Sequence, residues 1–467
     1  MPMKPFKNLT LLLSAALLSC LFLSQCQSQE ASEPSSAQWL FMDKNTPLYA
    51  EYWVGEGHHI NAMNGSQARI EAVRTSAKEQ TPFSYSIVDG TPYVGTLTQD
   101  DYILFRVPAG NMGKGSHVEV NAVLVSNPSS PKYFIIEYHE GGEWKSLGED
   151  VYPVPENPDM KYSFICSGLG QGEPHEYTSV YQTITLDSNV KDGELLIRFR
   201  AVGEYTCSGG PNDPSADDGS IGFATFGYTG AYIADYGTSV PTDTTDILCL
   251  GNSFTYFSNA PSMIKEIAWS QGHYFNVKAS LKGGQTLGQH TTRVLTRHLA
   301  GYGEYDYVFF QDQSQNPARY ASDPKGYASV AEDYMKLSGL VQSYSPECKI
   351  IMEQTWAYPA FRFGGFGDFD TFTNLLKEGA EKMAAQNGGL VSPIGEAYRI
   401  IWNESPEISL YDSDAKHQSH YGSYLKACVN YLMITGEPFH GTPADCSLEP
   451  SKAATIRAAA ERAVLGR

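Results

Sequence analysis

The segment Ile247-Leu248-Cys249-Leu250-Gly251-Asn252-Ser253-Phe254-Thr255 contains the strongest structural signal in the sequence. Its first four residues are apolar and end at a glycine, which predicts a short buried strand. A serine follows the strand and precedes a predicted helix over residues 261–270. Because ligands of parallel α/β sheets bind beyond the carboxyl ends of the strands, Ser253 is expected at a binding edge.

A second segment supplies the partners that a serine nucleophile needs. The sequence Asp414-Ala415-Lys416-His417 places a carboxylate and an imidazole on one turn, just before a predicted helix over 419–435. A serine hydroxyl needs an imidazole to take its proton and a carboxylate to orient that imidazole. Ser253, Asp414 and His417 are therefore the predicted catalytic residues. Taken singly, each has a plainer interpretation: a helix-capping serine, an aspartate that bonds a loop amide, and a surface histidine.

The chain from residue 246 onward alternates between apolar runs and helical patterns. Predicted strands cover 247–250, 307–310, 349–352 and 390–391, and predicted helices cover 261–270, 287–299, 326–343, 419–435 and 451–465. Alternating strands and helices predict a parallel sheet that is covered on both faces. Gly436 is expected to cap the 419–435 helix.

Residues 38–238 carry the pattern of an all-β domain instead. Apolar and polar residues alternate in several short runs, and Gly141-Gly142 predicts a hairpin turn between strands at 133–138 and 143–145. Many short strands with Gly, Pro and Asp turns predict a β-sandwich. This domain looks like the jelly-roll modules of exported carbohydrate enzymes, and residues 237–245 are expected to link it to the second domain.

The first 26 residues are predicted to be an export signal. Lys4 and Lys7 precede an apolar run over 9–23 that is too short and wrongly flanked for a stable membrane span. Either Cys20 or Cys26 is the expected lipidation site, with a polar tether over 27–37; an uncleaved anchor is the alternative. The protein is therefore expected on the bacterial outer membrane, the cell surface or in the periplasm.

Composition excludes several partners. The formal net charge of −19 argues against nucleic acid and against anionic membrane surfaces, so membrane contact is expected only through the lipid anchor. Cys166 and Cys207 could pair after export, whereas Cys249 is expected to be a buried thiol. None of the later cysteines shows a zinc-binding spacing, and no metal or cofactor is expected.

Residues 246–440 resemble the SGNH/GDSL hydrolase superfamily. Gly251-Asn252-Ser253 stands where the family usually has Gly-Asp-Ser, and Asp414 and His417 meet its Asp-x-x-His block. Gly284, in Lys282-Gly283-Gly284-Gln285-Thr286-Leu287, takes the position of the oxyanion glycine. Gln313, after the 307–310 strand, takes the position of the family's Asn. The blocks are similar to those of an uncharacterised branch in exported bacterial proteins.

This resemblance implies a three-layer, flavodoxin-like hydrolase domain over 246–467. It also implies an oxyanion hole formed by the amides of Ser253 and Gly284 and the side chain of Gln313. A structural glutamine at position 313 and a turn glycine at position 284 are the plainer interpretations.

The predicted function is a serine esterase that removes O-acyl groups, O-acetyl foremost, from a glycan or another small ester. Asn252, Trp356 and Tyr358 are predicted to contact the substrate, and the aromatic, glycine-rich segment 361–367 is expected to form a rim over the site. A lipase or thioesterase of the same fold is one alternative. A non-catalytic glycan-binding surface lipoprotein is the other.

Overall fold

The computed structural model describes residues 35–39, 59–62, 67–75, 83–88, 91–95, 97–110, 112–147, 151–166, 176–190, 193–209, 220–223, 231–238, 244–301 and 303–466. Cys20 and Cys26 lie outside these residues, so export and lipidation stay predictions. Within the ranges given, every helix falls short of the length and hydrophobicity that a bilayer span requires.

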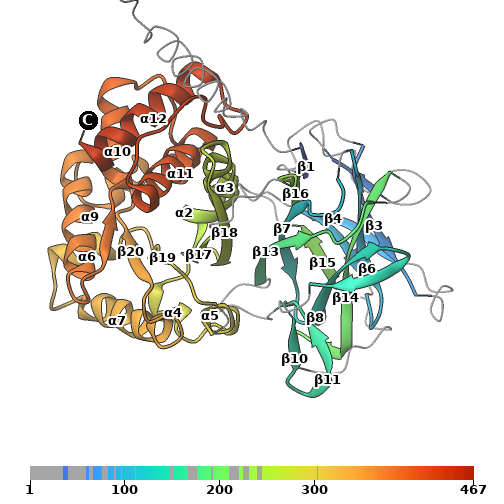
Figure 1. Cartoon of the computed structure of the whole chain (residues 1–467). Coiled ribbons are helices and arrows are strands. Elements are labelled where there is room, and N and C mark those ends of the chain that lie inside the picture. The colour runs from blue at the N-terminus through green and yellow to red at the C-terminus, as the bar shows by residue number, and fades with distance from the viewer. Residues whose placement is uncertain are drawn as a thin grey trace, which may run out of the picture.

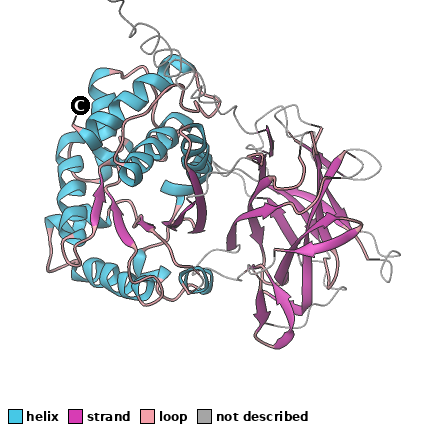
Figure 2. Cartoon of the chain, in the orientation of Figure 1, coloured by secondary structure: helices cyan, strands magenta, loops and turns pink. Residues whose placement is uncertain are grey.

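The carboxyl-terminal half is built on a five-stranded parallel sheet (Figures 1 and 2). Its strands, in spatial order, are β18 (Tyr274–Leu281), β17 (Thr244–Gly251), β19 (Tyr307–Phe310), β20 (Lys349–Glu353) and β21 (Leu390–Ser392). The chain leaves β17 toward one edge and returns to its other side, which is the flavodoxin-like order. The predicted parallel sheet is confirmed, and its switch point lies between the ends of β17 and β19.

Helices cover both faces of this sheet, as Figure 2 shows. They are α2 (Ser253–Tyr256), α3 (Ala260–Ser270), α4 (Leu287–His290), α5 (Val294–Ala300), α6 (Asn316–Ser322), α7 (Ala328–Gln342), α8 (Ala360–Gly364), α9 (Phe369–Ala384), α10 (Ile394–Glu404), α11 (His420–Thr435) and α12 (Pro450–Leu465), with a 3-10 turn η3 (Phe257–Asn259). Strand β17 shows why two layers form. Ile247 and Cys249 enter the core beneath α3 and α11, whereas Leu248 and Leu250 enter the core beneath α5 and α7.

Several predicted helices are present with altered bounds. The helix predicted over 287–299 is broken into α4 and α5, and the helix predicted over 326–343 begins at Ala328. Helix α11 ends at Gly436, which adopts the left-handed conformation expected of a capping glycine. Strand β18 and helices α6, α9 and α10 were not predicted.

The amino-terminal half contains two antiparallel sheets. One has the order β1 (Ser35–Trp39), β16 (Ala231–Asp235), β7 (His117–Ser126), β15 (Ser220–Phe223), β5 (Thr91–Gly95) and β4 (Ser84–Val88), with β13 (Glu176–Thr185) also paired to β7. The other has the order β12 (Phe164–Ile165), β8 (Pro131–Glu140), β14 (Glu194–Thr206), β6 (Tyr102–Pro108), β3 (Arg69–Val73) and β2 (His59–Asn61), with β9 (Glu143–Ser146) paired to β8. A small hairpin of β10 (Tyr152–Val154) and β11 (Asn157–Tyr162) stands beside them.

The two antiparallel sheets share one apolar core. Val120 and Leu124 of β7 pack in the same buried cluster as Phe105 of β6 and Phe199 of β14. The predicted pair of antiparallel sheets is confirmed, while the jelly-roll connection and the domain limits stay predictions. At the predicted hairpin turn, Gly141 and Gly142 both have positive φ.

The two halves meet through a buried polar cluster. Strand β13 lies beside β18 (Figure 1), and the hydroxyl of Ser262 on α3 donates to Glu119 on β7 at 3.0 Å. Lys265, one turn further along α3, lies 3.5 Å from Glu119 and donates to the Thr183 hydroxyl at 3.1 Å. Tyr181 donates to Asn259 at 3.1 Å. Since Glu119 and Lys265 are 3% and 2% exposed, the charge of each depends on the other half of the chain.

Candidate active site

The turn after β17 is held by the side chain of Asn252. Its Oδ1 accepts the Phe254 amide at 3.1 Å and thereby caps α2, while its Nδ2 donates to the Gln285 carbonyl at 2.8 Å and to the Asp312 carbonyl at 3.3 Å. Asn252 is 2% exposed. Its amide joins three loops beneath the nucleophile. Contact between Asn252 and substrate stays a prediction.

Ser253, His417 and Asp414 form a continuous hydrogen-bond chain. The Ser253 Oγ lies 2.8 Å from His417 Nε2, and His417 Nδ1 lies 2.5 Å from Asp414 Oδ2. Both distances match the nucleophile–base–orienting group arrangement of serine hydrolases. The structure thus brings together the three residues that the sequence predicted to act as a unit, although 164 positions separate the serine from the histidine.

The loop that carries Asp414 and His417 is tightly fixed. Asp414 Oδ1 accepts the backbone amides of Lys416 and His417, each at 2.9 Å, and the intervening Ala415 has a φ of +54°. A non-glycine residue adopts that conformation only when its surroundings impose it. Gln418, next in the chain, donates from Nε2 to the Ser253 carbonyl at 3.1 Å, so the loop is tied directly to the nucleophile turn.

Two aromatic rings set the position of the imidazole. Phe257 stacks on the His417 ring with centroids 4.3 Å apart and an interplanar angle of 10°. Phe254 meets the same ring edge-on at 5.5 Å. Phe254 lies in α2 and Phe257 begins η3, so both follow Ser253 closely. The turn that carries the nucleophile therefore also orients the base.

Electrostatics keep the imidazole neutral and the carboxylate charged. Burial lowers the pKa of His417 below its usual value, and the nearby Lys416 charge lowers it further, although Asp414 opposes both effects. Burial tends to raise the pKa of Asp414, but hydrogen bonds from the His417 ring and from two backbone amides outweigh it and lower that pKa. A neutral imidazole near neutral pH can accept the serine proton.

A buried ion pair lies beneath the nucleophile turn. Lys426 of α11 donates to Glu353 at the end of β20 at 2.5 Å, to the Phe254 carbonyl at 2.9 Å and to the Thr255 hydroxyl at 2.8 Å. Asn430, one turn along α11, donates to the other Glu353 oxygen at 2.8 Å. This network was not predicted from the sequence. A lysine and an asparagine in an otherwise apolar helix were the available signal.

The oxyanion candidates lie in three loops at the sheet edge. Gly284 is exposed with a φ of +68°, and neither its amide nor that of Ser253 donates to an acceptor among the described residues. Gln313 is half-buried: its Oε1 accepts the Gln315 amide at 2.9 Å, and its Nε2 lies 3.4 Å from the Ser314 hydroxyl. The Gln313 amide nitrogen therefore keeps donor capacity.

Asp312 fixes the two loops that carry these candidates. Its Oδ1 accepts the amide of Leu287 at 3.0 Å and that of Gln313 at 2.7 Å, so one carboxyl group holds the segment after Gly284 against the segment after β19. Burial raises the pKa of Asp312 to about 6 in spite of these hydrogen bonds. Its role is to position backbone, and the sequence analysis did not assign it one.

Trp356 and Tyr358 belong to the core, and their predicted contact with substrate stays a prediction. Trp356 is 0% exposed; it stacks on Phe254 at 4.3 Å and donates from Nε1 to the Lys416 carbonyl at 3.2 Å. Tyr358 is 1% exposed, and its ring meets Phe254 edge-on at 6.1 Å. Both rings support the site from below.

The expected rim segment is exposed and conformationally strained. Phe361, Arg362 and Phe363 all have left-handed backbone angles, and Phe361 is 78% exposed. The Ala360 amide donates to the Ala415 carbonyl at 3.1 Å, so this turn is attached to the loop that carries the base. Three consecutive non-glycine residues in this conformation cost about 1–2 kcal/mol each.

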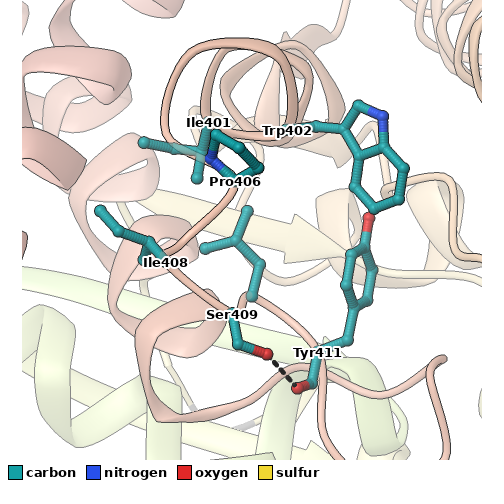
Figure 3. Close-up of a pocket in the computed structure, with 7 residues that line it drawn as sticks. Ile401, Trp402, Pro406, Ile408, Ser409 and Tyr411 are labelled. Carbon is teal, nitrogen blue, oxygen red and sulfur yellow. Dashed lines mark hydrogen bonds between the residues drawn. The ribbon is translucent and has the colours of Figure 1, made fainter.

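A cavity of about 440 Å³ is lined by residues of α10 and of the segment 406–411, which precedes Asp414 in the chain (Figure 3). Trp402 and Tyr411 form one wall with ring centroids 6.1 Å apart, and Ile401, Pro406 and Ile408 form the facing wall. Tyr411 pairs with Gln418 in an isolated β-bridge. The cavity wall is thereby connected to the segment that bonds Ser253.

Comparisons with known proteins give weak similarities. No protein-family model and no curated protein matches the chain. Among solved structures, a DUF4886 family protein from Bacteroides uniformis is 18% identical, with 48% of this chain and 95% of that chain covered and a TM-score of 0.40.

Two further solved structures cover more of the chain. A peptidoglycan O-acetylesterase is 10% identical, covers 82% of this chain and 79% of its own, and has a TM-score of 0.33. A carbohydrate esterase family 2 enzyme with a carbohydrate-binding domain, from Corynascus thermopiles, is 14% identical, covers 76% of this chain and 99% of its own, and has a TM-score of 0.30. Because these identities and scores are low, the chemistry of this chain rests on its own site geometry.

Proposed function

We propose that the protein is a serine ester hydrolase of the SGNH/GDSL type. The observation that carries this proposal is the hydrogen-bond chain from Ser253 through His417 to Asp414. It lies at the switch point of a parallel sheet, which is where such folds bind ligands. These three side chains supply the nucleophile, the base and the orienting group that attack on an ester requires.

The reaction follows from the geometry. Ser253 Oγ attacks the acyl carbon while His417 Nε2 takes its proton, and Asp414 stabilises the imidazolium that forms. The amides of Ser253 and Gly284, with the Gln313 side chain, donate to the oxyanion. His417 then gives the proton to the departing alcohol, and a water activated by His417 hydrolyses the acyl-enzyme to acid and free serine.

An O-acetyl ester on a glycan is the proposed substrate. The predicted export, the sandwich domain and the aromatic walls of the cavity beside the catalytic loop support a sugar ligand. Trp402 is 38% exposed and stands at right angles to Tyr411, so it offers an aromatic surface on which a sugar ring could stack.

The test is hydrolysis of p-nitrophenyl acetate by the purified protein and by Ser253→Ala. We expect turnover that the alanine variant lacks, and covalent labelling of Ser253 by a fluorophosphonate. Equal rates for both proteins, with no labelling at Ser253, would leave the non-catalytic glycan-binding protein as the better account. Preference for long-chain or thioester substrates over acetylated glycans would favour a lipase or thioesterase.

A further inference from the structure

A lysine ammonium stands beside the proposed catalytic histidine without an ionic partner. Lys416 Nζ lies 5.9 Å from the ring centroid of Phe254 and 5.7 Å from that of Tyr358, the two rings that support the nucleophile turn. In the described part of the chain this ammonium forms no ion pair and no hydrogen bond. Its charge nevertheless acts on His417, whose pKa it lowers.

The backbone of Lys416 is fixed at both ends. Its amide donates to Asp414 Oδ1 at 2.9 Å, and its carbonyl accepts the Trp356 indole N–H at 3.2 Å. The side chain therefore starts from a defined point between the catalytic loop and the aromatic floor. The Asp414 carboxylate accepts three other hydrogen bonds, from the ring and amide of His417 and from the amide of Lys416, and among the described residues it forms no ion pair with the Lys416 ammonium.

The partial burial of the Lys416 ammonium costs free energy in the protein without substrate. Lys416 is half-buried, and burial lowers the pKa of its ammonium, although the Asp414 charge opposes this. The chain as a whole has a net charge of −19, so acidic groups to pair with a lysine are abundant elsewhere on it. A half-buried cation that faces aromatic rings instead of a carboxylate is suited to an anion that arrives with the substrate.

We infer that Lys416 is a specificity residue that binds a carboxylate carried by the substrate close to its ester, so that the preferred substrate is an acylated acidic sugar. This inference rests on the proposed function and adds the charge of the glycan to it. A uronic acid unit has the required chemistry, since it presents a carboxylate on the same sugar ring as its esterified hydroxyls. The charged hydrogen bond to Lys416 would lower the free energy of the bound acidic sugar relative to its neutral counterpart.

The experiment compares two O-acetylated oligosaccharides that differ only in the acid group. One is built from galacturonic acid and the other from galactose, with the acetyl at the same position, and kcat/KM is measured for both. We expect the wild-type protein to prefer the acidic sugar about tenfold, the effect of one charge-assisted hydrogen bond. Lys416→Met should remove this preference, and Lys416→Arg should retain most of it.

Lys325, an exposed lysine between α6 and α7, provides the matched control. Lys325→Met should keep both the activity and the preference of the wild type. A wild-type ratio near one, or a ratio that Lys416→Met leaves unchanged, overturns the inference while ester hydrolysis stands. If the wild-type protein hydrolyses both sugars and p-nitrophenyl acetate no faster than Ser253→Ala does, the proposed function is overturned. The inference then falls with it.

Discussion

Lys426 and Glu353 form a buried ion pair, 2.5 Å long, directly beneath the turn that carries Ser253. The lysine side chain is 1% exposed and the glutamate side chain is 2% exposed. The ammonium also donates hydrogen bonds to two groups of the nucleophile turn, the Phe254 carbonyl and the Thr255 hydroxyl. The Lys426 ammonium therefore links helix α11 to strand β20 and to the nucleophile turn.

Replacing Lys426 with Met should destabilise the protein strongly. The change leaves Glu353 buried without its cation, and breaking a buried pair in this way typically costs about 3–5 kcal/mol. Urea unfolding followed by circular dichroism measures the loss. The double variant Lys426→Met with Glu353→Gln should recover part of the stability, because no uncompensated charge is left. A single variant as stable as the wild type would contradict the structural role of the pair.

Asp414→Asn should reduce kcat by about 10³-fold or more, because an asparagine no longer holds the imidazole in the tautomer that accepts the serine proton. Asp412→Asn is the control, since Asp412 lies on the same loop and its carboxylate, among the residues that the structure describes, accepts only the Ser413 amide at 2.7 Å. The rate of p-nitrophenyl acetate hydrolysis should fall in the first variant and stay near the wild-type value in the second. Similar rates for both variants would remove Asp414 from the mechanism.

The pH profile should reflect the lowered pKa of His417. The base acts when neutral, so kcat/KM should rise as the pH passes through the pKa of His417 and level off above it. Because that pKa lies below 6.5, the midpoint of the rise should also lie below 6.5. Lys416→Met should move the midpoint upward, since the lysine charge depresses the pKa. A midpoint above 6.5 in the wild type would show that burial does not dominate at this histidine.

Gly251→Ala should disturb the nucleophile turn. A Cβ at this position would lie 2.8 Å from the Gln311 Oε1 and 2.9 Å from the Thr255 Oγ1, so both side chains must move. Overpacking of this kind costs about 1–3 kcal/mol, and activity should fall together with stability.

Gly339→Ala provides the comparison for this substitution. Gly339 lies on the exposed side of α7, and a Cβ there would have no heavy atom within 4 Å. Alanine favours a helix over glycine by up to about 1 kcal/mol, so this variant should be as stable as the wild type or more stable. Thermal unfolding and ester hydrolysis of the two variants, measured side by side, check both expectations.

The structural features that depend on neighbouring residues or on a strong apolar pattern could be predicted from the sequence. The run 247–250 is apolar on both sides of the strand because helices cover both faces, and the spacing of Asp414 and His417 places both groups on one turn. These features follow from local chemistry. The parallel sheet and the meeting of Ser253 with His417 were predictable from them.

Features that depend on distant contacts were not predictable. Trp356 and Tyr358 follow a strand end, which suggested exposure at the site, but the stacking of Trp356 on Phe254 places them in the core. The side-chain amide of Asn252 donates to loop carbonyls more than 30 positions away, and the sequence alone did not predict these contacts. Helix α9 was not predicted; it begins at Phe369, just after the aromatic segment 361–367 that was expected to form a rim.

The polar cluster between Glu119 and Lys265 has a practical consequence for anyone who dissects this chain. A fragment that starts at β17 would lack Glu119, the anion that pairs with Lys265, and would expose the side of β18 that β13 covers. We therefore expect such a fragment to aggregate or to lose its fold. The amino-terminal sheets therefore help to hold the carboxyl-terminal half in its fold, and biochemical experiments should use the two halves together.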